Sequence, residues 1–250
     1  NKITFDPYET KLESDCFVNC TSLNHLELFS SVNSVDKIEI DNYCKITKIT
    51  IPETVSSIQD ESFSCCSNLE TLILNPYSIN VSAKSFENCP SLYCLSYVSS
   101  ITTVSRFDYN NFINFTVIII PPSVTSIADY AFSECYSINQ ISIPSSVTHI
   151  GISAFSKCTA LTQITIPSSI THIADGFLYG CCSLKQVKIP SSVISIGNFA
   201  FCKCSSMTQI VILPSIKYIG NFAFSECTSI TQIPIPQSVT HIGDSAFSEC

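Results

Sequence analysis

The sequence predicts an α/β repeat solenoid, a fold in which successive turns of the chain stack and pair through parallel β-strands. One observation behind this prediction is a cysteine that recurs with a period of 23 residues. The other is an apolar pattern that repeats in the same phase between these cysteines. In steps of 23 from Cys20, cysteine occupies nine of eleven positions: Cys20, Cys66, Cys89, Cys135, Cys158, Cys181, Cys204, Cys227 and Cys250.

The first element expected in each turn is a short strand. With the recurring cysteine as position zero, aliphatic residues stand at positions six and eight, as Ile164 and Ile166 do. This alternation is typical of a strand with one buried face. A proline such as Pro167 usually follows, and it ends the strand because it has no N–H to donate. We therefore expect Ile164 to be buried and Gln163 to be exposed.

A second, shorter extended segment is expected after the proline. Its marks are aliphatic residues at positions twelve and fifteen, such as Ile170 and Ile173. An Ala-Phe pair then precedes the next cysteine, which favours a single helical turn. Glycine stands at position sixteen in four turns, and we interpret it as a backbone turn with positive φ. These glycines are Gly151, Gly197, Gly220 and Gly243.

The repeat predicts one solenoid over residues 1–250, with about eleven turns of 23 residues. Residues 1–19 keep the phase as a degenerate N-terminal repeat, and residues 20–250 carry the regular repeats. A single repeat buries too little apolar surface to fold alone, so stability should come from contacts between neighbouring turns. Nothing covers the last strand edge, and no signal-peptide core precedes the first repeat, so we expect a piece of a longer protein.

Segments such as CTALTQITIPSSITHIADGF and CTSITQIPIPQSVTHIGDSAFSEC resemble the BspA-like, Treponema-type leucine-rich repeats. These repeats are found in bacterial surface proteins and are expanded in parasitic protists. The resemblance covers essentially the whole chain. It implies a right-handed solenoid with a parallel sheet on its concave side, and a surface protein of a bacterium or protist that takes part in adhesion or host contact. It implies no catalytic residue.

The charge and the apolar runs exclude two classes of partner. The chain has 12 Lys and Arg residues against 20 Asp and Glu, a formal net charge of −8. This charge does not favour sequence-independent binding of nucleic acid. The longest uninterrupted apolar run, residues 117–120, is far shorter than the roughly 20 residues that a membrane-spanning helix needs. We therefore expect no nucleic acid partner and no membrane-spanning segment.

No residue pattern in the chain indicates catalysis or metal binding. The recognised hydrolase, metalloprotease, phosphate-loop and dinucleotide motifs are missing from the sequence, so we predict no enzyme, no catalytic residue, no cofactor and no metal site. We interpret the position-zero cysteines as buried thiols rather than as disulfides. His149, His172 and His241 share position fourteen, where we expect exposed polar side chains rather than a metal or pH-sensitive site.

The candidate binding residues lie on the exposed side of the predicted strands. Glutamine holds position five in five consecutive turns, at Gln140, Gln163, Gln186, Gln209 and Gln232. Their carboxamides can form a structural hydrogen-bonded ladder or belong to a recognition surface. The neighbouring positions vary more, as a recognition surface does, and add Thr162, Thr165, Lys185, Lys188 and Tyr93, with Cys94 as a further variable position.

These observations predict a non-enzymatic protein-binding module. Its ligand would be a protein or a host glycoprotein, and the concave sheet would provide cell-surface adhesion or host interaction. The matching location is the cell surface or the secreted medium. The alternative is an intracellular, cytoplasmic leucine-rich-repeat scaffold or a regulatory domain of a larger protein, which unbridged cysteines favour. No oligomeric state follows from the sequence.

Overall fold

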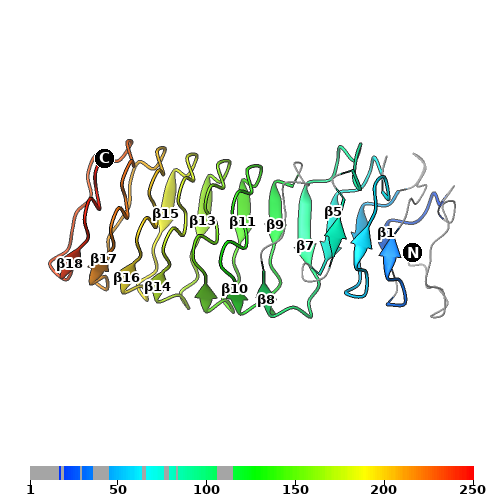
Figure 1. Ribbon diagram of the computed structural model, residues 1–250, viewed down its shortest axis with the longest axis horizontal. Coiled ribbons are helices and arrows are strands. Elements are labelled where there is room, and N and C mark those ends of the chain that lie inside the picture. Colours follow the sequence, from blue (N-terminus) through cyan, green and yellow to red (C-terminus); the bar gives the residue numbers. More distant parts are fainter. Residues whose placement is uncertain are drawn as a thin grey trace. The chain divides into compact units, whose positions relative to one another are not determined.

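The computed structural model describes residues 17, 20–28, 30–35, 45–63, 66–75, 79–82, 84–105 and 115–250. The chain forms two compact units, residues 1–99 with 110–115 and residues 100–109 with 116–250. Each unit is a stack of turns that contribute strands to two rows (Figure 1). We call the strand near positions five to seven the first row and the strand near positions fourteen and fifteen the second row.

The strands of the first unit pair in parallel with a constant offset. Leu26 pairs with Ile49 and Ile49 pairs with Leu72, so each turn advances the register by 23 residues. The first row runs in the order β1 (His25–Glu27), β3 (Lys48–Thr50), β5 (Thr71–Leu74) and β7 (Cys94–Tyr97). The second row is β2 (Ser34–Val35), β4 (Ser57–Ile58) and β6 (Asn80–Val81).

The second unit keeps the same two rows and the same offset. Its first-row pairs are β9 (Val117–Ile119) with β11 (Gln140–Ser142), and β13 (Gln163–Thr165) with β15 (Gln186–Lys188). One second-row sheet contains β8 (Thr103–Val104), β10 (Ser126–Ile127) and β12 (His149–Ile150). The other contains β14 (His172–Ile173), β16 (Ser195–Ile196), β17 (Tyr218–Ile219) and β18 (His241–Ile242).

The core of the second unit confirms the expected inward and outward positions. Ile164 and Ile166 of one turn are at most 5% exposed. Gln163, which precedes Ile164, and Thr165, which lies between the two isoleucines, are exposed. The Ala-Phe phenylalanines also stack from turn to turn, with ring centroids 5.2 Å apart for the parallel pair Phe132 and Phe155. Burial of these side chains between turns explains why the chain folds as a stack.

The first row is shorter than the sequence predicts. The described residues form first-row strands in eight turns rather than in about eleven. Gln209 has only an isolated bridge to Gln186, and no strand forms around Gln232. Pro234 stands at position seven of that last turn and has no N–H for a ladder, which accounts for the loss of pairing there. The predicted degenerate repeat lies, over residues 1–16, outside the described residues.

The Ala-Phe segment is not a helical turn, and the described residues contain no helix. In one turn, two residues of this segment have left-handed backbone: Ser153 with φ 52° and Lys157 with φ 59°. A helical turn needs consecutive right-handed residues, so this backbone excludes it. The N–H groups of Ser153, Phe155 and Lys157 donate instead to carbonyl groups of the following turn.

Glycine at position sixteen is needed for space and not for a positive φ. Of the six glycines, only Gly176 and Gly180 have positive φ. A Cβ on Gly197 would lie 2.4 Å from Oδ1 of Asp175, and also 2.7 Å from the backbone N of Asp175 and 2.8 Å from the backbone C of Ala174. The same Asp175 oxygen accepts a 2.7 Å hydrogen bond from the N–H of Asn198. One turn carries Ala174 at position sixteen instead of glycine. The turn before it has Ile152 at position seventeen, the place that Asp175 holds before Gly197, and isoleucine has no side-chain oxygen.

The buried cysteines are thiols that join neighbouring turns. All twelve cysteines among the described residues are free, which agrees with the predicted thiols. The thiol of Cys158 donates to the carbonyl oxygen of Phe132 at 3.1 Å, and that of Cys227 to Phe201 at 3.1 Å. Burial raises the pKa of Cys204, and it raises the pKa of Cys227 to about 12. The thiols of Cys204 and Cys227 therefore stay protonated in the folded stack, and burial keeps reagents away from them.

The first prediction concerns the pairing of glycine with an acidic or amide side chain of the preceding turn. Gly197→Ala should lower the free energy of unfolding by about 3 kcal/mol, because the new Cβ overlaps the Asp175 oxygen and the backbone of Ala174 and Asp175. Asp175→Ile removes that oxygen and reproduces the arrangement of Ile152 with Ala174. In urea unfolding, the double variant should be more stable than the sum of the two single changes by about 1 kcal/mol or more. Strictly additive changes would contradict this explanation.

The second prediction concerns thiol reactivity. Titration of the folded protein with a disulfide reagent should modify the exposed Cys182 and Cys250, while the buried position-zero thiols react only after denaturation. The control is the same titration of denatured, non-reduced protein, which should reveal the buried thiols. Almost no free thiol in the denatured sample would show that the cysteines are bridged.

Candidate functional site

The candidate site is the outward side of the first-row strands in the second unit. β13 and β15 alternate exposed, buried and exposed residues because Ile164 and Val187 face the core. Gln163 and Thr165 therefore face outward from β13, and Gln186 and Lys188 face outward from β15. The 23-residue register places Gln163 opposite Gln186 and Thr165 opposite Lys188.

A groove of about 540 Å³ crosses this surface. Its lining comes from three consecutive turns: Gln163, Ile164, Thr165, Gln186, Val187, Lys188, Ile189, Gln209, Ile210, Val211 and Leu213. Val211 is 66% exposed, more than any other large apolar side chain that the structure describes in the second unit. The groove thus combines carboxamides, a hydroxyl group, an ammonium group and apolar surface.

The chain changes its pattern on one side of the groove. Leu213 occupies position nine, where Pro167 and Pro190 stand in the two preceding turns, and Pro214 follows one residue later. In this turn the first-row ladder is reduced to the bridge between Gln186 and Gln209. Val211 stands at position seven, one of the variable outward positions, as Thr165 and Lys188 do. Leu213 is a lining residue that the outward pattern does not predict, although the displaced proline marks this turn.

The five glutamines do not form the ladder that the sequence allowed. Gln163 and Gln186 are register partners and Gln186 bridges Gln209 through the backbone, yet no side-chain hydrogen bond joins one carboxamide to another among them. A primary amide that is exposed and not bonded to its neighbours can donate and accept hydrogen bonds to a ligand. The carboxamides therefore remain available for recognition.

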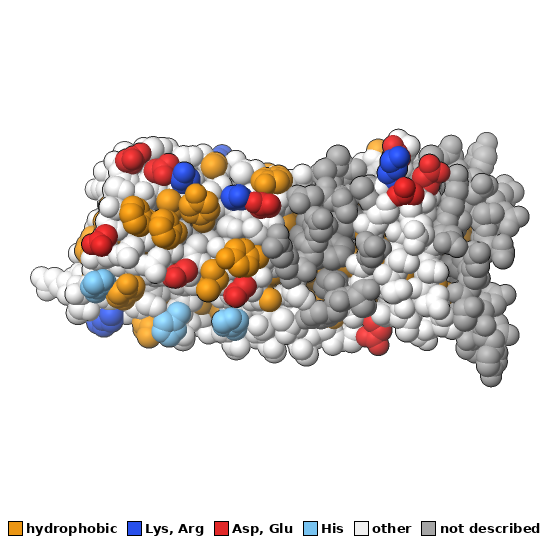
Figure 2. All heavy atoms as spheres, viewed as in Figure 1, with side chains coloured by type: hydrophobic (Ala, Val, Ile, Leu, Met, Phe, Trp, Pro, Cys, Tyr) orange, Lys and Arg blue, Asp and Glu red, His pale blue; other side chains and the backbone are white. Residues whose placement is uncertain are grey.

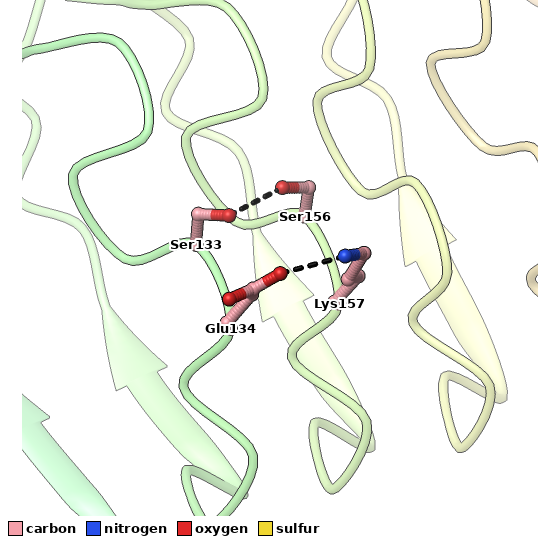
Figure 3. A network of polar contacts seen from close by, with 4 residues as sticks. All are labelled: Ser133, Glu134, Ser156 and Lys157. Carbon is pink, nitrogen blue, oxygen red and sulfur yellow. Dashed lines mark hydrogen bonds and ion pairs between the residues drawn. The ribbon is translucent and has the colours of Figure 1, made fainter. Parts of the chain in front are cut away.

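The lysines of the second unit fall into two sets. Lys188 lines the groove and Lys185 is exposed just before β15, and neither forms an ion pair with a residue that the structure describes. Lys157 Nζ instead lies 2.6 Å from Oε1 of Glu134, and Lys203 Nζ lies 3.4 Å from Oε1 of Glu226. Figure 3 shows the first of these pairs beside the Ser133–Ser156 hydrogen bond. The hydrogen bond with Glu134 raises the pKa of Lys157.

The remaining candidate residues lie outside the groove. Gln140 is exposed on β11, and Thr162 is exposed just before β13. Gln232 lines a smaller hollow of about 250 Å³, with Thr231, Ile235, Phe247 and Cys250 among its neighbours.

The first unit holds the two other candidates. Tyr93 is exposed and directly precedes β7, as expected for a binding residue. Cys94 is buried at 4% exposure, and burial raises the pKa of its thiol. The expectation that Cys94 belongs to the exposed recognition surface is therefore wrong. Cys94 lies on the same side of the sheet as its register partner Thr71, but its side chain is covered.

The three histidines at position fourteen, His149, His172 and His241, occupy the second row and are exposed, as expected. Figure 2 shows them at intervals along one border of the second unit. His172 Nδ1 lies 2.8 Å from Thr171 Oγ1, and the His241 ring stacks on Tyr218 at 4.6 Å. Within the described residues, no three His, Cys, Asp or Glu side chains come close enough to hold a metal ion. None of these residues forms a helix with the length and apolar character that crossing a bilayer requires.

Comparison with known protein families gives one match, which extends over the chain. The family described as BspA type Leucine rich repeat region matches residues 1–114, 79–205 and 171–250 in six copies. Comparison with curated proteins finds no match.

Solved structures of leucine-rich repeat proteins share the fold. A leucine-rich repeat protein from Eubacterium ventriosum aligns with 17% identity and a TM-score of 0.51, covering 91% of this chain and 82% of its own. The Treponema pallidum leucine-rich repeat protein aligns with 20% identity and a TM-score of 0.50, covering 74% and 78%. One from Bacteroides ovatus has 24% identity and a TM-score of 0.47, covering 92% and 77%.

Proposed function

The chain belongs to the BspA type leucine-rich repeat family, and on this premise we propose that it binds another protein through the outward side of its first-row strands. The observation that carries the proposal is the groove lined by Gln163, Gln186 and Gln209, whose carboxamides are not bonded to one another. A repeating surface of exposed side chains suits contact with an extended protein surface. The leucine-rich-repeat fold is consistent with such a module.

The chemistry of the groove supports binding rather than catalysis. Its polar groups are three carboxamides, the Thr165 hydroxyl and the Lys188 ammonium group. Nucleophilic catalysis needs a nucleophile next to a base that is itself held in place, and no such pair lines the groove. The proposed role is therefore a non-enzymatic one.

We further propose that the protein acts at the cell surface or after secretion, where it would contribute to adhesion or contact with a host glycoprotein. The argument is the family resemblance of its repeats. The free thiols favour the alternative, an intracellular scaffold or a regulatory part of a larger protein, because thiols persist in reducing compartments. Biotinylation of intact cells with a membrane-impermeant reagent separates the two: labelling supports the surface location, and labelling only after lysis contradicts it.

The third prediction tests the binding surface. Gln163→Ala, Gln186→Ala and Gln209→Ala together should weaken binding to a partner by about tenfold, or about 1.4 kcal/mol, because three ligand-facing amides are lost. Thermal unfolding should change little, since exposed substitutions usually shift stability by within about 0.5 kcal/mol. The measurement is surface plasmon resonance against a panel of immobilised extracellular-matrix and plasma glycoproteins.

The matched control changes three exposed residues of the second row, His149→Ala, His172→Ala and His241→Ala. It should bind like the unmodified protein. Unchanged binding by the glutamine variant together with loss in the histidine variant would place the binding surface on the second row instead.

A further inference from the structure

We infer that the ligand of the groove is an extended, acidic peptide segment of a partner protein. This inference rests on the proposed function and adds the chemical class of the ligand. Three observations carry it: acidic residues are excluded from the strand surface, its two lysines have no ion-pair partner, and the groove displays free carboxamides beside exposed apolar surface.

Acidic residues are excluded from the strand surface of the second unit. Residues 116–250 contain six of them, all at positions seventeen or twenty-two of their turns: Asp129, Glu134, Asp175, Glu226, Asp244 and Glu249. Positions four, five and seven of the same turns carry none of them. These three positions form the outward stripe around the first-row strands, and the only charged residues among them are Lys185 and Lys188.

The acidic groups nearest in sequence to these lysines already have partners elsewhere. Glu134 and Glu226 pair with Lys157 and Lys203. Asp175 accepts a backbone hydrogen bond from the next turn, at 2.7 Å. The ammonium groups of Lys185 and Lys188 therefore keep an uncompensated positive charge on this surface. At moderate ionic strength that charge attracts carboxylates over about 10 Å.

The carboxamides match the hydrogen-bonding groups of a peptide backbone. Each exposed amide presents donors and an acceptor, as each peptide group does, and an extended segment needs partners for both. Gln163, Gln186 and Gln209 supply them from three consecutive turns. Val211 and Leu213 add apolar surface for a side chain of the ligand. No aromatic ring lines the groove to stack against a sugar ring, which favours a peptide over an acidic oligosaccharide.

The test measures binding of labelled probes to the full chain by fluorescence anisotropy. The probe is a rhodamine-labelled extended decapeptide in which glutamate alternates with valine and threonine. One comparison peptide carries lysine in place of each glutamate, and a labelled heparin oligosaccharide of similar charge represents a non-peptide anion. The acidic peptide should bind, should weaken as salt is raised, and should bind more tightly than either comparison probe.

The decisive variant is Lys185→Glu with Lys188→Glu, which should weaken binding of the acidic peptide by about tenfold or more. The matched control, Lys203→Glu with Lys217→Glu, makes the same change of net charge at exposed lysines outside the groove and should bind as before. Thermal unfolding of both variants shows that each remains folded.

Three outcomes would overturn the inference. Equal binding of the acidic and basic peptides, unaffected by Lys185→Glu with Lys188→Glu but lost with the three glutamine substitutions, leaves a peptide-binding surface and removes the role of charge. If the oligosaccharide binds more tightly than the acidic peptide, the ligand is not a peptide and the inference is wrong. No peptide binding, while a panel protein still binds through the three glutamines, removes the inference and leaves the proposed function standing.

Discussion

Hydrogen bonds between a turn and the turn 23 residues away hold this structure in register. They come from the backbone and from side chains at fixed positions: the Cys158 thiol donates to Phe132, the Ser192 hydroxyl donates to Ile170, and the N–H of Asn198 donates to Asp175. A buried carbonyl or N–H that lost its partner would cost free energy, so a turn cannot slip by one residue without leaving several groups unsatisfied. The inward row of aliphatic residues and the outward row of glutamines both follow from this register.

The sequence predicts the parts of the fold that depend on period and burial. The strands, the buried Ile164, the exposed Gln163 and the free thiols follow from the 23-residue repeat and are confirmed. The helical turn and the reason for glycine were wrong, since both depend on contacts between turns. Serine and lysine seldom adopt left-handed backbone, so the sequence does not indicate the positive φ of Ser153 and Lys157. The role of Gly197 becomes visible only when Asp175 of the preceding turn is placed beside it.

The candidate site was predictable as a stripe and not as a groove. Outward positions follow from strand alternation, so Gln163, Thr165, Gln186 and Lys188 lie where the pattern placed them. The groove also depends on Val211 and Leu213, in a turn whose ladder is reduced to a single bridge. Whether neighbouring carboxamides bond to one another is decided by side-chain geometry that a repeat pattern does not contain. The absence of those bonds leaves the carboxamides free to bond to the ligand that we propose.

The most direct test of the register is a pair of deletions in the second unit. Removing residues 159–181 takes out one full period of 23, so Cys158 becomes the cysteine of the next turn and the backbone hydrogen bonds between turns can form again. Removing residues 159–180 takes out one residue fewer and shifts all later turns by one position. Urea unfolding should show a cooperative transition with a small loss of stability, that of one turn, for the first deletion and a much larger loss for the second. Equal stability of the two proteins would contradict the account.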